Sequence, residues 1–207
     1  MGRAVLRRLA QALTSICTSA LFLLLGLPAQ AADYPQLQPI IYPPTFAPDY
    51  FFNEVRLGGY AHGIGDPERG TADVNAEILT RRIATLSNPD YAWLVPRLHV
   101  GGTINTAGRT SYLYAGFTWT LENLIWRGAF AEVTFGVSVN NGRTGDFVPP
   151  DHSRIGCHTL FRESASLGYR FDEHWSVMAT IEHVSNGGLC HQNRGVTAGG
   201  LRIGYSF

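Results

Sequence analysis

The sequence predicts an all-β protein, an eight-stranded antiparallel transmembrane β-barrel of the up-and-down type. Three observations predict this fold class. Apolar and polar residues alternate in eight separate segments after about residue 52. Only 15% of the residues are charged while 12% are aromatic, a composition that suits a membrane barrel better than a soluble helical domain. The N-terminus, finally, has the pattern of an export signal.

Length and charge narrow the class of protein further. A chain of 207 residues is long enough for one domain with a full-sized core. The 16 basic and 16 acidic residues cancel, so the formal charge gives no reason to expect a nucleic-acid partner.

Residues 1–31 are predicted to be a cleaved signal peptide. A basic segment with Arg3, Arg7 and Arg8 precedes a short apolar stretch, and the small residues Ala29 and Ala31 follow as a cleavage pattern. A retained membrane helix is the alternative, but the apolar core is short and is followed closely by the cleavage pattern.

Residues 32–50 are predicted to form a proline-rich leader before a barrel domain that spans 51–207. Proline fixes φ and cannot donate to a sheet, so this segment is expected to be extended. The prolines are Pro35, Pro39, Pro43, Pro44 and Pro48.

The first four predicted strands each have one apolar row and one small or polar row, as alternate side chains of a strand require. The third is expected to begin at Pro96, because proline is tolerated at the first position of a strand. The apolar rows are Val55, Leu57 and Ala61 in 53–62; Val74, Ala76 and Ile78 in 73–79; Leu98, Val100 and Ile104 after Pro96; and Leu113, Ala115, Phe117, Trp119 and Leu121 in 112–121.

The last four predicted strands follow the same rule. Their apolar rows are Ala131, Val133, Phe135, Val137 and Val139 in 130–139; Phe161, Ala165, Leu167, Tyr169 and Phe171 in 158–171; Trp175, Val177, Ala179 and Ile181 in 175–185; and Leu201, Ile203, Tyr205 and Phe207 in 197–207. The opposite rows carry charges such as Glu132, Arg162 and Arg202, which are expected to form a polar network inside a narrow barrel.

Alternation alone does not exclude a soluble periplasmic β-sandwich that binds an apolar ligand, since its apolar faces would point inward. The export signal and the aromatic residues near strand ends favour the barrel. The last strand also ends in Phe207, which resembles the sorting signal of bacterial outer-membrane barrels. The expected location is therefore the bacterial cell outer membrane.

Loop lengths predict which end of the barrel faces outward. If the C-terminus is periplasmic, residues 172–174 form a short periplasmic turn, and the connections at 140–156 and 187–196 are longer outer loops. Cys157 and Cys190 then lie at the outer rim. Two cysteines in an exported chain are most simply a disulfide. No cysteine or histidine spacing fits zinc, so neither a metal site nor a cofactor is expected.

The candidate chemistry lies where the seventh apolar row ends. His183 and Ser185 follow Ile181 on the same strand face, so the two side chains can come within hydrogen-bond reach. A histidine next to a serine can take its proton and make it a nucleophile. The plainer interpretation is that both residues lie above the hydrocarbon, where polar side chains are common.

The motif His183-Val184-Ser185-Asn186, followed by Asn193-Arg194-Gly195 and a last strand ending in Phe207, resembles the lipid A 3-O-deacylase (PagL) family of outer-membrane barrels. The resemblance is specific over about 157–207. It implies a serine esterase that removes the acyl chain from the 3-position of lipid A, the membrane anchor of lipopolysaccharide, without a metal or other cofactor. Ser185 would be the nucleophile and His183 the general base, on the lipid-facing wall. Whether the chain forms a homodimer stays open.

One position departs from the family pattern. The family has an acidic residue fourteen positions after the histidine, where this chain has Thr197. A threonine can accept a hydrogen bond from the imidazole but lacks a carboxylate's charge. If the short turn after Phe171 sets the register between the two strands that it joins, Glu163 lies directly opposite His183 on the neighbouring strand. Glu163 is therefore the candidate substitute acid. Glu182 points to the other face and is rejected.

The backbone N–H groups of Asn186 and Gly187, where the strand becomes a loop, are the candidate oxyanion donors. The alternative to an active esterase is a weakened or inactive outer-membrane barrel with a structural or adhesive role. Thr197 is the residue that favours this alternative.

Overall fold

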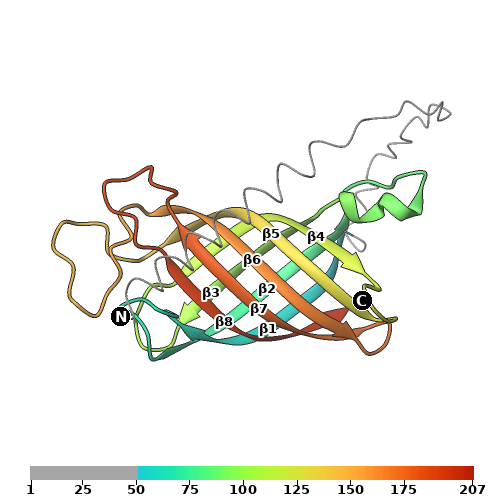
Figure 1. Ribbon diagram of the computed structural model, residues 1–207, viewed down its shortest axis with the longest axis horizontal. Helices are drawn as coiled ribbons and strands as arrows, with labels where there is room; N and C mark the ends of the chain where they lie inside the picture. Colours follow the sequence, from blue (N-terminus) through green and yellow to red (C-terminus); the bar gives the residue numbers. More distant parts are fainter. Residues whose placement is uncertain (1–50) are drawn as a thin grey trace, which may run out of the picture. The chain divides into compact units, whose positions relative to one another are not determined.

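Eight antiparallel strands close into a barrel in the computed structural model, which describes residues 51–207 (Figure 1). Each strand pairs with its neighbours in sequence, and the first pairs with the last, so no sheet edge is left open. The strands are β1 (Phe52–His62), β2 (Thr71–Arg82), β3 (Arg97–Asn105), β4 (Tyr112–Glu122), β5 (Ala129–Asn140), β6 (Thr159–Arg170), β7 (Trp175–Ser185) and β8 (Val196–Ser206).

The prediction of an eight-stranded up-and-down barrel is confirmed. The predicted signal peptide at 1–31 and the predicted leader at 32–50 lie outside the described residues. Strand β2 extends beyond the predicted 73–79 at both ends, and the register between β2 and β3 shifts between Leu79 and Arg82. Leu79 and Thr80 are consequently both buried, which breaks the period of two that the sequence pattern relies on.

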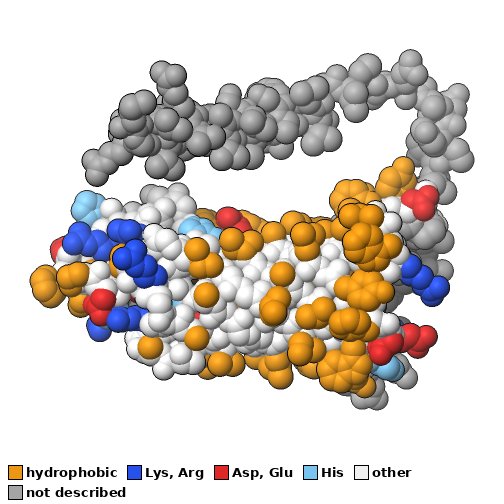
Figure 2. All heavy atoms as spheres, turned by 60° about the horizontal axis from the view of Figure 1, so that its bottom comes forward, with side chains coloured by type: hydrophobic (Ala, Val, Ile, Leu, Met, Phe, Trp, Pro, Cys, Tyr) orange, Lys and Arg blue, Asp and Glu red, His pale blue; other side chains and the backbone are white. Residues whose placement is uncertain are grey.

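The apolar rows face outward, as predicted. Leu57 on β1, Leu113 on β4 and Leu201 on β8 are each more than 60% exposed. Figure 2 shows apolar side chains spread over the barrel wall, most densely toward the end where the chain terminates. An outward apolar surface on a closed barrel is typical of a protein that meets lipid rather than water. No helix among residues 51–207 is long and apolar enough to cross a membrane.

The interior is filled by paired charges. Arg56 forms a two-pronged ion pair with Glu132, at 2.6 and 2.8 Å. Arg162 pairs with Glu182 at 2.6 Å, and the Arg162 guanidinium also stacks over the Tyr114 ring at 3.7 Å from its centroid. Four buried arginines and four buried glutamates thus share the described lumen: Arg56, Arg97, Arg162 and Arg202 with Glu54, Glu77, Glu132 and Glu182. This is the internal polar network that the sequence predicted.

The two ends of the barrel differ. One end, called the loop end, carries the connections at 63–70, 106–111, 141–158 and 186–195. The other, called the terminal end, carries the start of β1, the end of β8 and the connections at 83–96, 123–128 and 171–174. Figure 1 shows the two long loops, between β5 and β6 and between β7 and β8, at the same end of the barrel.

One connection at the terminal end is longer than the short turns that the sequence predicted. Residues 83–96 contain a 3₁₀ helix, η1 (Pro89–Leu94). The Asn88 side chain caps it by accepting a hydrogen bond from the Asp90 N–H, and Arg82 holds its far side through the Val95 carbonyl at 2.8 Å. Asparagine followed by proline is a strong start signal for such a helix.

Candidate functional site

His183 and Ser185 lie on the outward face of β7, near the loop end. Their neighbours Glu182 and Val184 are fully buried in the lumen, whereas His183 and Ser185 are half-buried. Strand β7 is flanked by β6 and β8, and the register places Phe161 opposite Ser185 on one side and Thr197 opposite His183 on the other. The pair therefore sits on the outer wall with a strand on each side.

Thr197 holds the imidazole. The Nδ1 atom of His183 lies 2.9 Å from the Thr197 hydroxyl, so Thr197 orients the ring. If the threonine oxygen accepts from Nδ1–H, the other ring nitrogen, Nε2, is the basic one. No hydrogen bond joins His183 to Ser185 in residues 51–207. Such bonds are often long in the absence of substrate and tighten when it binds.

Glu163 lies where the register argument placed it but does not touch the imidazole. The predicted pairings of Glu163 with His183 and of Phe161 with Ser185 are both present. The Glu163 side chain is exposed, and no hydrogen bond or ion pair links it to His183 within the described part of the chain. Its role as substitute acid stays a prediction without a contact, while Thr197 has one.

Gly195 is a site residue that the sequence analysis quoted only as part of a motif. A Cβ atom at this position would lie 2.7 Å from both Cε1 and Nε2 of His183 and 2.5 Å from the Val184 carbonyl. Real Cβ atoms do not approach other heavy atoms so closely. The absence of a side chain at Gly195 therefore lets the imidazole lie against the backbone just before β8, next to its partner Thr197.

Replacing Gly195 with alanine is expected to displace His183 and to lower kcat by about 100-fold, the usual cost of a misplacement of about 1 Å at a reacting group. The control is Gly145→Ala, because Gly145 has open space around its Cβ position. Both variants are compared by ester hydrolysis and by heat-modifiable gel mobility. A folded Gly195→Ala barrel with wild-type kcat would show that the packing of this ring is irrelevant.

The loop at 186–195 is built around the Asn186 side chain. Its amide donates to the Ile155 carbonyl at 2.8 Å and to the Gln192 carbonyl at 2.6 Å, and its oxygen accepts from the Gly188 N–H at 2.9 Å. The Asn186 backbone N–H is also occupied, by the Asn193 side chain at 2.9 Å. Asn186 is thus a structural centre of the loop, and its N–H is not free to bind an oxyanion without rearrangement.

Gly187 differs from Asn186 in this respect. None of the described residues accepts a hydrogen bond from the Gly187 N–H. The residue has φ of +62°, and its Cβ position lies 3.2 Å from the Phe161 ring. Glycine is suited to this backbone conformation, so Gly187 is the better placed of the two predicted oxyanion donors.

Cys157 and Cys190 form the predicted disulfide, with Cα atoms 6.1 Å apart. The bond joins the β5–β6 loop to the β7–β8 loop directly beside Asn186. A cavity of about 410 Å³ opens next to it, between the disulfide and the Phe161 ring, with Leu189 and Val137 among its other walls. The outer wall next to Ser185 is therefore hollowed as well as apolar.

A second network fastens the remaining loops at this end. The Glu68 carboxylate accepts hydrogen bonds from His62, from the Thr110 N–H and hydroxyl, and from the Ser153 N–H, all at 2.9 Å. Burial acts to raise the pKa of Glu68, but these hydrogen bonds lower it to about 2. The carboxylate therefore stays ionised and joins three loops at neutral pH.

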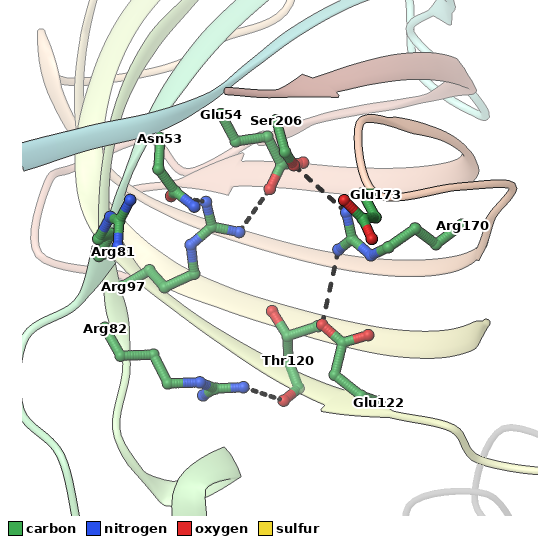
Figure 3. Close-up of a pocket in the computed structure, with 10 residues that line it drawn as sticks. All are labelled: Asn53, Glu54, Arg81, Arg82, Arg97, Thr120, Glu122, Arg170, Glu173 and Ser206. Atoms are coloured by element: carbon green, nitrogen blue, oxygen red, sulfur yellow. Dashed lines mark hydrogen bonds and ion pairs between the residues drawn. The ribbon is translucent and has the colours of Figure 1, made fainter. Parts of the chain in front are cut away.

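The opposite mouth of the barrel holds another cavity, of about 340 Å³ (Figure 3). Arg97 donates there to Glu54 and Asn53, Arg82 to the Thr120 carbonyl, and Arg170 to Ser206. This cavity lies at the terminal end, far along the barrel from His183. Among residues 51–207, no group of three or more His, Cys, Asp or Glu side chains is arranged so that it could hold a metal ion.

The closed eight-stranded barrel and its apolar outer surface define the class of protein as a membrane β-barrel. The histidine–serine pair on the wall gives this barrel a candidate hydrolase site. The model of the family described as lipid A 3-O-deacylase (PagL) matches residues 85–206. Because this match covers more than half of the chain, the chain belongs to the PagL family.

The comparison with solved structures concerns the fold alone. The chain is similar to a protein solved as "Crystal structure of the outer membrane enzyme PagL", with a TM-score of 0.57 and 19% identity over 73% of this chain and 97% of that one. A designed protein, "De novo design of transmembrane beta-barrels", has a TM-score of 0.48 and 13% identity over 75% of this chain and 95% of the other. No curated protein is significantly similar to this chain in sequence.

Proposed function

We propose that this protein is an outer-membrane serine esterase that hydrolyses the 3-O-linked acyl chain of lipid A. The observation that carries the proposal is the His183–Thr197 hydrogen bond. It orients the imidazole of the family motif on the outer wall of the barrel, two residues from Ser185. Because the chain belongs to the PagL family of lipid A 3-O-deacylases, we take lipid A as the substrate and its 3-O-linked ester as the bond that is cleaved.

The reaction follows from the positions of these groups. Ser185 attacks the acyl carbonyl and gives its proton to Nε2 of His183, which then passes the proton to the departing sugar oxygen. The negative oxygen of the tetrahedral intermediate accepts a hydrogen bond from the Gly187 N–H. Water activated by His183 then cleaves the acyl-enzyme and releases the fatty acid. No cofactor takes part in this scheme.

The location is part of the proposal. The apolar outer wall faces lipid, so a substrate acyl chain reaches Ser185 from the membrane without leaving it. With the loop end outward, the site lies in the outer leaflet, where the lipid A of lipopolysaccharide resides. Residues 1–31 would direct export and be removed.

The direct test is mass spectrometry of lipid A from cells that lack a deacylase and express this protein. The expected result is a lipid A that has lost one hydroxyacyl chain, with the free hydroxy fatty acid recovered. Unchanged lipid A, with the barrel confirmed in the outer membrane by fractionation, would favour the structural or adhesive role instead. A protein that stays soluble without detergent would contradict the membrane location.

Variants of Thr197 and Glu163 test which of the two residues orients the His183 imidazole, because different effects on kcat are expected for them. Thr197→Val removes the hydroxyl without changing the shape of the side chain. It is expected to lower kcat by about 10- to 100-fold, the value of one hydrogen bond to a charged group. Thr197→Glu restores the family's carboxylate and is expected to raise kcat.

Glu163→Gln serves as the matched control and is expected to keep nearly full activity, because Glu163 does not contact the imidazole. All three variants are measured on the same acyl ester in detergent micelles. A loss of activity in Glu163→Gln, with Thr197→Val unaffected, would assign the acid role to Glu163.

A further inference from the structure

Three arginines meet at the loop end, beside the candidate site. Arg143 and Arg154 come from the β5–β6 loop and pair as an isolated parallel bridge, with the Ile155 N–H donating to the Arg143 carbonyl at 3.1 Å. Arg194 comes from the β7–β8 loop, and its N–H donates to the Arg154 carbonyl at 2.9 Å. Backbone hydrogen bonds therefore hold the three residues side by side, as an arginine cluster of Arg143, Arg154 and Arg194.

No acidic residue in the described part of the chain neutralises the arginine cluster. All three side chains are exposed, and no carboxylate of residues 51–207 lies within ion-pair distance of them. Arg109, on a neighbouring loop, is different because it pairs with Asp151 at 2.6 Å. Figure 2 shows basic side chains gathered at this end of the barrel. Neighbouring like charges repel one another, so the arrangement is expected to favour an anion that bridges them.

The arginines at the opposite mouth show what structural arginines look like in this protein. Arg82, Arg97 and Arg170 each donate to a carbonyl, carboxylate or hydroxyl oxygen of the barrel (Figure 3). The side chains of the arginine cluster at the loop end have no such partners among residues 51–207, although the three arginines lie on adjacent chain segments. A role in holding the fold therefore does not explain it.

The arginine cluster adjoins the candidate site on two sides. Arg194 directly precedes Gly195, which lies against the His183 ring. On the other side Arg154 precedes Ile155, whose carbonyl accepts from the Asn186 side chain at 2.8 Å. The disulfide between Cys157 and Cys190 joins the same two loops. The cluster is thus fixed relative to His183 and Ser185, but on the solvent side of them.

We propose that the arginine cluster of Arg143, Arg154 and Arg194 binds a phosphate monoester on the headgroup of the glycolipid substrate. Guanidinium groups bind phosphate through two parallel hydrogen bonds, and several can share one phosphate. Lipid A is a phosphorylated glucosamine disaccharide, so a phosphate held at the loop end places the sugar, and with it the acyl ester, above Ser185. This inference rests on the proposed function, because it names what selects the substrate of that site.

The first test is steady-state kinetics in detergent micelles on phosphorylated lipid A and on the same lipid after its phosphates have been removed. The variant Arg143→Gln/Arg154→Gln/Arg194→Gln is expected to raise KM for the phosphorylated lipid by about 10- to 100-fold and to leave kcat unchanged. Its KM for the dephosphorylated lipid is expected to equal that of the wild type. The difference is expected to shrink as salt is added, because exposed charges are screened.

The control is Arg127→Gln, which removes an exposed arginine at the terminal end and is expected to change neither KM. Heat-modifiable mobility establishes that every variant is folded. An active enzyme whose KM ignores both the phosphates and the arginine cluster would overturn this inference and leave the proposed function standing.

The second test does not depend on catalysis. The wild-type barrel in micelles is titrated with a water-soluble phosphorylated glucosamine disaccharide and, separately, with inorganic phosphate. Binding of the disaccharide that is lost in the triple variant supports the inference, even if no ester is ever cleaved. Inorganic phosphate binding as tightly as the disaccharide would overturn a headgroup site in favour of a general anion site.

Discussion

Ser185→Ala is expected to abolish ester cleavage while leaving the barrel intact. The serine hydroxyl is the protein group that forms a covalent bond to the substrate in the proposed reaction, and removing such a nucleophile lowers kcat by about 10⁴-fold or more. The side chain is half-buried on the outer wall and makes no hydrogen bond within residues 51–207, so its loss is expected to cost little stability.

The measurement is hydrolysis of purified lipid A in micelles, with released fatty acid quantified by mass spectrometry. His183→Ala is expected to lose a comparable factor. The double variant is expected to be no worse than either single one, because residues that act as a unit are not additive. Residual activity above about a tenth of wild type in Ser185→Ala would assign the nucleophile elsewhere.

Glu77→Gln is expected to have the largest effect on stability. The Glu77 carboxylate lies in the lumen 2.9 Å from Arg202, 3.2 Å from Arg56 and 4.0 Å from Arg162. Its side chain is fully buried, and so are the side chains of these three arginines. Removing one partner from a buried ionic network leaves an uncompensated charge and costs about 3–5 kcal/mol.

The free energy of unfolding is measured by urea titration in lipid vesicles, with Glu122→Gln as the matched control. Glu122 also pairs with an arginine, Arg170, but at 3.6 Å and with 40% of its side chain exposed. Exposed ion pairs contribute at most about 1 kcal/mol, so this variant is expected to unfold almost like the wild type. Equal losses in the two variants would contradict the assignment of the lumen network as a determinant of stability.

The sequence alone determined the strands, the two faces of the wall and the register next to the site. A strand exposes its period of two in any short window, so eight segments and their apolar rows could be recognised without a structure. The three-residue turn after Phe171 set the pairing of β6 with β7, because turn length fixes register in a hairpin. That is why the position of Glu163 opposite His183 was correct even though the two side chains do not touch.

Only the tertiary structure decided which residues contact the His183 imidazole. Thr197 reaches His183 because β7 and β8 pair in one register, and the loop between them is too long and irregular for its geometry to be predicted from the sequence. Gly195 is recognisable as a contact only when its distance to the ring is known.

The arginine cluster could likewise be recognised only in the tertiary structure. Its three members are scattered over residues 143 to 194 and are brought together by backbone hydrogen bonds between two loops. Loops have no period to read, and contacts between distant segments exist only once the barrel has closed. Local alternation thus determined the wall of this protein, whereas closure of the barrel determined its site.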